Sequence, residues 1–237
     1  MTTSSSYDFT VTTQEVIEEA LEWIGFLASG ETPEDDDLTV CRTTLNLLVK
    51  LWSGPNNRFM PGLKMWQRER ASLTLVASQG SYDLKPSGGD LDIQIPTQIL
   101  TASLRDSSSN DTPMRSMTLE EYESIGDKSA DGDPGAYYYE RRTDTGKLYL
   151  DHEPSDTTKT IRLVYLQPIE DLDANANDLD FPVEYHLPIA HQIGVHVAPK
   201  FGIPLTQDHY AQAQASAQMV QTFEPPRSTV FFEPDKD

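Results

Sequence analysis

The sequence predicts an α+β fold in which N- and C-terminal helices form one bundle, an antiparallel β domain is inserted between them, and an extended C-terminal tail follows. Residues 136–166 alternate apolar and polar side chains with a period of two, which is typical of half-buried strands. The segments 12–52 and 182–222 instead carry apolar residues at spacings of three and four, as amphipathic helices do. Pro225 and Pro226 prevent the last residues from continuing a helix, because proline lacks the amide hydrogen and clashes with the preceding turn.

Two helices are predicted near the N-terminus. Thr12 and Glu15 form a capping-box pair in front of the first apolar stripe. A second start signal at residues 32–35 combines a capping hydroxyl, a first-turn proline and acids that favour the positive end of the helix dipole. Gly54-Pro55 ends the second helix, so the two helices are expected to form an αα-hairpin.

The segment between the two helical regions is predicted to be the β domain. Its strand candidates are short alternating runs at residues 73–76, 82–84, 93–95 and 99–104 and three runs within 136–166. A short helix is expected at 117–125, where Thr118 and Glu121 repeat the capping signal. None of these runs carries a recognisable catalytic group.

The composition changes again after Pro168, where an acidic, linker-like stretch precedes the C-terminal helices. The predicted organisation therefore has four parts: residues 1–67 (N-terminal helical part of the bundle), 68–168 (inserted β domain), 169–222 (acidic linker and C-terminal helices) and 223–237 (extended tail).

The charge argues against ordinary nucleic-acid binding. The chain has 38 acidic and 18 basic residues, a formal net charge of −20, whereas binding to phosphates rests on Lys and Arg that displace counterions. From Leu163 to Pro199 there is no Lys or Arg. This stretch is interpreted either as a solvated acidic surface or as a surface that faces DNA without gripping it. The DNA-facing candidates are Asp171, Asp173, Asp178 and Asp180.

No motif predicts an enzyme, a metal site or a cofactor. The run at 171–182 begins like an EF-hand loop, but Ala176 stands where the loop requires glycine and Pro182 where it requires glutamate. The histidines near residue 190 recur at intervals of five, which spreads them around a helix. The single cysteine, Cys41, excludes an internal disulfide. A signal peptide and an apolar run of the ~20 residues that span a membrane are both missing from the sequence, so no membrane partner is expected.

Aromatic residues supply the candidate interfaces. Tyr137, Tyr138 and Tyr139 are expected on a strand with one aromatic face against the core and one against a partner. The tail is expected to bind a partner because exposed apolar side chains on an extended segment are costly to leave in water. Its predicted anchors are Phe223, Val230, Phe231 and Phe232.

Several segments of the chain also match a known family in order and spacing. They are TVTTQEVIEEALEWIGFLASGE followed by a helix with the pair Leu45-Asn46, ASQGSYDLKP at 77–86, the stretch from Gly135 to Pro154, and FPVEYHLPIAHQIGVHVAPKFG at 181–202. Together they resemble the head-to-tail adaptor proteins of short-tailed bacteriophages, also described as head-completion or packaged-DNA-stabilising proteins. The resemblance covers most of residues 9–205.

The resemblance implies a structural virion protein, assembled in the host cytoplasm. Some members of the family are described as cleaving peptidoglycan, but no residue pattern in this sequence predicts such an activity, and no enzyme or cofactor is expected. Family members form a ring, usually a dodecamer, beneath the portal protein, and the ring receives the tail nozzle or the tail fibre and spike proteins. DNA passes through the lumen without specific binding. The C-terminal region reaches along the portal, so the tail anchors are expected to bind it.

Two other functions stay open at the level of the sequence. The tyrosine-rich strands are compatible with a saccharide- or cell-surface-binding module of a phage tail. The abundance of carboxylates is compatible with a cell-wall hydrolase that uses a carboxylate pair, although no particular pair is brought together by the sequence.

Overall fold

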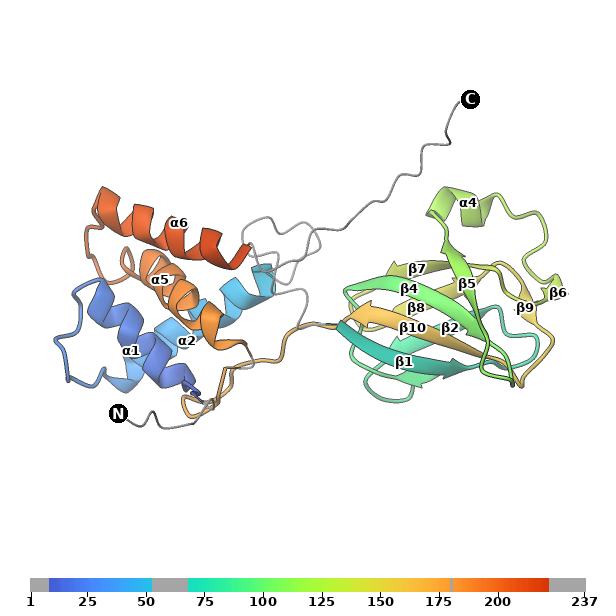
Figure 1. The fold of residues 1–237 in the computed structure, drawn as a ribbon, viewed down its shortest axis with the longest axis horizontal. Coiled ribbons are helices and arrows are strands. Elements are labelled where there is room, and N and C mark those ends of the chain that lie inside the picture. Colours follow the sequence, from blue (N-terminus) through green and yellow to red (C-terminus); the bar gives the residue numbers. More distant parts are fainter. Residues whose placement is uncertain (1–8, 53–67, 180, 222–237) are drawn as a thin grey trace, which may run out of the picture. The chain divides into compact units, whose positions relative to one another are not determined.

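A computed structural model describes residues 9–52, 68–179 and 181–221, and these residues divide into two compact units (Figure 1). The helical unit contains residues 9–48 and 172–221. The sheet unit contains residues 49–52 and 68–171.

The described residues of the helical unit form four α-helices and one short 3₁₀ helix. The elements are α1 (Thr13–Trp23), α2 (Asp35–Trp52, whose last residues belong to the sheet unit), η1 (Val183–Tyr185), α5 (His186–Val197) and α6 (Gln207–Gln221). Helix α5 packs against both α1 and α6 (Figure 1). It is buried on most of its circumference, so it forms the centre of this unit.

The start of α1 confirms the predicted capping box. The Thr12 hydroxyl accepts a hydrogen bond from the Glu15 amide at 3.3 Å, and the Glu15 carboxylate accepts one from the Thr12 amide at 2.8 Å. The acids of the second start signal lie in the first turn of α2, where the helix dipole favours negative charge. Local sequence therefore determines where these helices begin.

Helix α5 lies very close to the end of α1. A Cβ atom added at Gly194 would come within 2.7 Å of Trp23 Cε3 and 2.9 Å of Ile24 Cγ2. Only glycine allows the two helices to approach this closely. Pro188 is tolerated in α5 because it lies in the first turn, where its missing amide hydrogen would have no partner in the helix.

The sheet unit is dominated by one eight-stranded mixed sheet of order β1-β10-β4-β5-β7-β8-β2-β3 (Figure 1). Its strands are β1 (Arg68–Thr74), β2 (Ser81–Lys85), β3 (Leu91–Asp92), β4 (Gln98–Arg105), β5 (Asp111–Ser116), β7 (Ala136–Arg141), β8 (Gly146–Leu150) and β10 (Thr160–Leu166). The short strands β6 (Asp131–Gly132) and β9 (Glu153–Pro154) pair with each other, and α4 (Leu119–Glu123) lies between β5 and β6 in the chain.

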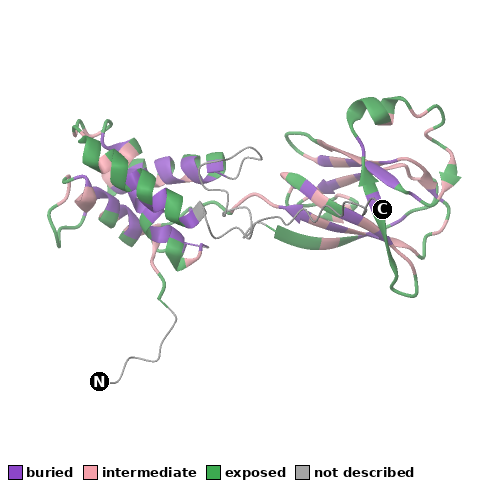
Figure 2. Ribbon diagram, turned by 45° about the horizontal axis from the view of Figure 1, so that its top comes forward, coloured by how far each residue is buried: buried purple, intermediate pink, exposed green. Residues whose placement is uncertain are grey.

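The strands enclose a single apolar core (Figure 2). Inward-facing residues alternate with outward-facing ones along each strand, as in β8, where Gly146, Leu148 and Leu150 are buried and the residues between them are partly exposed. The two edge strands, β1 and β3, contact each other, so the sheet nearly closes into a barrel. The core side chains are Leu73, Leu75, Tyr82, Leu84, Ile99, Ala102, Leu104, Met114, Tyr137, Leu148, Leu150, Ile161, Leu163 and Tyr165.

The predicted fold class is therefore wrong. The structure is mostly a large mixed β-sheet nearly closed into a barrel, with few helices, and is not a helical bundle with an inserted antiparallel β domain. Strand β5 pairs in parallel with β7, and β2 pairs in parallel with β3. The period-two pattern identifies strands but carries no information about which strands pair or in which direction. The predicted extended tail, residues 223–237, lies outside the described residues.

We predict that Gly194→Ala destabilises the helical unit by about 1–3 kcal/mol, because the new methyl group must displace Trp23 and Ile24. Urea unfolding followed by tryptophan fluorescence measures the change. Gly126→Ala is the control, since a Cβ at that position meets no atom within 4 Å. Equal stability of the two variants would contradict the close approach of α1 and α5.

Candidate partner-binding surfaces

A groove of about 400 Å³ lies in the helical unit, between the segment that leads into α1 and the start of α5. Phe9, Val183 and Leu187 line it, and their side chains are 66%, 45% and 52% exposed. Glu15 and Glu19 lie on the same groove. The groove therefore combines apolar walls with negative charge. A partner side chain that is apolar and has cationic side chains beside it would suit this groove.

His186 gives the groove one unsatisfied polar atom. The ring is 8% exposed, and its Nε2 atom lies 3.1 Å from the carbonyl oxygen of Phe181. Its Nδ1 atom is buried without a hydrogen-bond partner. Since a buried polar atom without a partner costs free energy, a bound group that supplies a hydrogen bond to Nδ1 would be favoured.

His191 is instead part of the packing of the helical unit. Its ring stacks on Trp23 with centroids 4.5 Å apart, and its Nδ1 atom lies 3.0 Å from the Ser216 hydroxyl. The residue thus joins α1, α5 and α6. Burial lowers the pKa of His191 below its ordinary value of 6.5, so the neutral imidazole is favoured in the folded protein.

This environment predicts a pH-dependent stability. Because the folded pKa of His191 is lowered, its contribution is complete above pH 6.5 and is lost as the pH falls toward the folded pKa, where the unfolded chain binds the proton more readily. We expect the free energy of unfolding to decrease between about pH 7 and pH 5, and less steeply in His191→Gln. Urea titrations at several pH values measure this, with His196→Gln, at an exposed position, as the control.

The three consecutive tyrosines of β7 lie in different environments. Tyr137 is 2% exposed and belongs to the sheet core. Tyr139 packs against that core, and its hydroxyl donates to the carbonyl oxygen of Pro96 at 2.6 Å. Tyr138 points to the opposite face, where its ring lies 5.8 Å from that of Tyr122 and 5.7 Å from that of Tyr149. Of the three predicted interface tyrosines, Tyr138 alone lies on the outer face.

The aromatic cluster Tyr122–Tyr138–Tyr149 connects α4 to the sheet. The Lys128 ammonium lies 4.7 Å from the centre of the Tyr122 ring, which adds a cation–π contact. This cluster could not be predicted from local patterns, because Tyr122 lies in a different element from Tyr138 and Tyr149 and becomes their neighbour only through the fold. The outward-facing ring of Tyr138 is therefore partly covered by Tyr122 and Tyr149 of the same chain.

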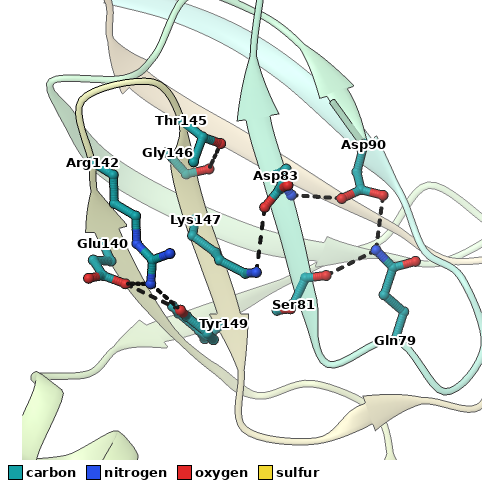
Figure 3. Close-up of polar contacts among 10 residues, drawn as sticks. All are labelled: Gln79, Ser81, Asp83, Asp90, Glu140, Arg142, Thr145, Gly146, Lys147 and Tyr149. Carbon is teal, nitrogen blue, oxygen red and sulfur yellow. Dashed lines mark hydrogen bonds and ion pairs between the residues drawn. The ribbon is translucent and has the colours of Figure 1, made fainter. Parts of the chain in front are cut away.

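A network of paired charges covers the outer surface of β2, β7 and β8 (Figure 3). The Glu140 carboxylate accepts hydrogen bonds from Arg142 at 2.7 Å and from the Tyr149 hydroxyl at 3.2 Å. The hydrogen bond from Arg142 holds the pKa of Glu140 below its usual range. A carboxylate that stays ionised and paired is a poor proton donor, so this surface is suited to contact rather than to acid–base chemistry.

A second part of the network orders the loop after β2 (Figure 3). The Asp90 carboxylate accepts hydrogen bonds from the Asp83 amide at 2.7 Å and from the Gln79 side chain at 2.9 Å. Lys147 lies 3.7 Å from the Asp83 carboxylate. The polar groups of this surface are thereby paired with one another.

The predicted DNA-facing acids that the structure describes are exposed. Asp171 makes an ion pair with Lys50 at 2.7 Å, and its side chain is 64% exposed. Asp173 and Asp178 are exposed, whereas Asp180 lies outside the described residues. Within residues 9–52, 68–179 and 181–221 there is no group of three or more metal-binding side chains.

The tail anchors Phe223, Val230, Phe231 and Phe232 also lie outside the described residues. The sequence did not predict the groove residues Phe9, Val183 and Leu187. The spacing of Val183 and Leu187, one helical turn apart and off the main apolar stripe, is the signal that could have identified them.

We predict that Tyr138→Ala increases amide hydrogen exchange in residues 119–125, because α4 loses a stacking partner that holds it to the sheet. Hydrogen exchange followed by mass spectrometry provides the measurement. Tyr210→Ala, an exposed tyrosine of α6, is the control and should leave that segment unchanged. Unaltered protection in Tyr138→Ala would show that the ring does not hold α4.

The helices in the described part of the chain are each too short or too polar to span a lipid bilayer.

A search of curated proteins returns no match. The family model of the SU10 adaptor protein matches residues 11–229, which is nearly the whole chain. SU10 adaptor proteins are phage head–tail adaptors, a structural class rather than an enzyme class, and this places the protein in the virion among head and tail components. The chain belongs to the SU10 adaptor protein family of bacteriophage head–tail adaptors.

Proposed function

We propose that this adaptor forms a ring that joins the portal protein to the tail and continues the DNA channel. The family match over residues 11–229 is the observation that carries the proposal. On the tail side the partners are the nozzle or the fibre and spike proteins. Ring assembly takes place in the host cytoplasm before the ring becomes part of the virion.

The distribution of charge supports passage of DNA without tight binding. In residues 9–48 and 172–221, Arg42 and Lys200 are the only Lys or Arg side chains, while acids occur throughout. A surface of this kind repels phosphates, so DNA that moves past it would not be retained. Asp173 and Asp178 are the exposed acids of the predicted channel stretch in this unit.

Electron microscopy of the purified full chain, alone and mixed with the portal protein of the same virus, tests the proposal. We expect a ring of copies coaxial with the portal. A chain that neither attaches to the portal nor assembles with it would refute the adaptor ring. Twelve copies per portal would agree with the expected dodecamer. A closed ring with a different number of copies would change the expected ring order but not the proposed function.

The tail anchors give a second test. Deletion of residues 225–237 is expected to abolish attachment to the portal, because Val230, Phe231 and Phe232 are removed with it. Co-sedimentation with the portal measures the loss. A chain of unchanged length with Asp235 and Asp237 replaced by Asn is the control, since it keeps the apolar anchors. Attachment at the level of the full chain would disprove the role of the tail.

A further inference from the structure

The outer face of β1, β10 and β4 carries a row of arginines in a protein that is otherwise strongly acidic. On β1, Arg68 and Arg70 are exposed, as is Glu69 between them, and Ala71 packs against the core. Arg162 and Arg105 alternate with buried residues on β10 and β4. Ser72 and Ser103 are the cross-strand neighbours of Arg162, and Val164 is that of Arg70. The pairing of β10 with both β1 and β4 therefore gathers these side chains on one surface.

A shallow polar hollow of about 300 Å³ opens on this face. Arg70, Arg162, Thr101, Ser103 and Asp111 line it, together with apolar parts of β10. Two guanidinium groups, two hydroxyl groups and the single carboxylate of Asp111 thus surround the hollow. This set of hydrogen-bond donors matches an acceptor with negative charge, such as a carboxylate.

The arginines of this face outnumber the carboxylate that pairs with them. Asp111 accepts two hydrogen bonds of 2.7 Å from Arg105, and it lies 3.7 Å from Arg162. Arg70 has no ion pair within the part of the chain that the structure describes. Arg162 and Arg105 thus share the one carboxylate of Asp111, and Arg70 is available to an external anion.

We propose that this arginine face binds the acidic helical unit of a second copy of the same chain. Every copy carries both complementary surfaces, since residues 9–48 and 172–221 of the helical unit contain Arg42 and Lys200 as their only Lys or Arg against many acids. Exposed acids of this unit, such as Glu19, Glu34 and Glu184, supply the carboxylates. A contact between two different surfaces of identical chains is heterologous, and it closes into a ring when the rotation per copy allows.

A second copy fits the arginine face better than nucleic acid does. DNA approaching the chain meets a net charge of −20, which opposes binding. A neighbouring copy presents carboxylates at short range, and bidentate arginine–carboxylate pairs give such a contact a defined geometry. The inference rests on the proposed ring and assigns the surface that connects its copies.

Charge reversal tests the contact. In Arg70→Glu/Arg162→Glu we expect copy-to-copy association to weaken at least about tenfold, because like charges then meet across the interface. The matched control is Lys85→Glu/Arg141→Glu, which changes the net charge equally at other positions of the sheet unit and should associate as the unchanged chain does. Sedimentation velocity, on the full chain alone and with the portal protein, measures association, and thermal unfolding verifies that each variant is folded.

Zero-length crosslinking identifies the acidic partner. Arg70→Lys/Arg162→Lys keeps the charge and adds amines that carbodiimide joins to adjacent carboxylates. Mass spectrometry of mixed isotope-labelled copies is expected to show links from positions 70 and 162 to carboxylates in residues 9–48 or 172–221 of another copy. Links confined to one chain, or only to the sheet unit of another copy, would overturn the proposal.

The outcomes separate this contact from the adaptor role. Equal association of the charge-reversed and control variants overturns the arginine face, even if both still attach to the portal. Loss of binding to a labelled DNA duplex in the charge-reversed variant, with copy-to-copy association unchanged, assigns the face to nucleic acid and also overturns it. Failure of the unchanged chain to attach to the portal would count against the proposed function instead.

Discussion

The sheet unit depends on the burial of inward-facing side chains from its strands in one apolar core. Tyr82, Leu84, Leu148, Ile161 and Leu163 are at most 1% exposed, and each alternates with a residue on the outer face. Because the side-chain period of a strand is two, a shift of register by one residue would turn the core outward. The register that buries the core therefore also determines which residues lie on the outer face, where a partner can bind.

Two outer surfaces follow from that alternation, and they differ in character. On β7 and β8 the charges are paired with one another and Tyr138 is stacked between two further tyrosines, so this surface is largely satisfied by its own contacts. On β1, β10 and β4 the cationic side chains exceed their acidic neighbours. An adaptor must bind several components at once, and a sheet whose two sides carry different chemistry can bind different partners.

The helical unit depends on a different constraint, the close approach of α1 and α5 at Gly194. That approach brings Trp23 over His191, and His191 in turn meets Ser216 of α6. Residues at the starts of α1 and α5 line the groove, where His186 has its unsatisfied Nδ1. The described part of the chain holds no cluster of metal-binding side chains, and its carboxylates with lowered pKa values are paired or capped.

The sequence by itself determined the features that depend on neighbours in the chain. Local patterns predicted the capping boxes at Thr12 and Thr118, the acids at the start of α2 and the strands in residues 136–166. This was possible because caps and side-chain periods involve residues only a few positions apart. The family resemblance was likewise visible in ordered motifs. Only the tertiary structure decided that β5 and β7 pair in parallel, that the sheet nearly closes, and that the arginines of three strands share one face. Those features arise from contacts between residues far apart in the chain, and strand direction and partner leave no trace in a local period of two.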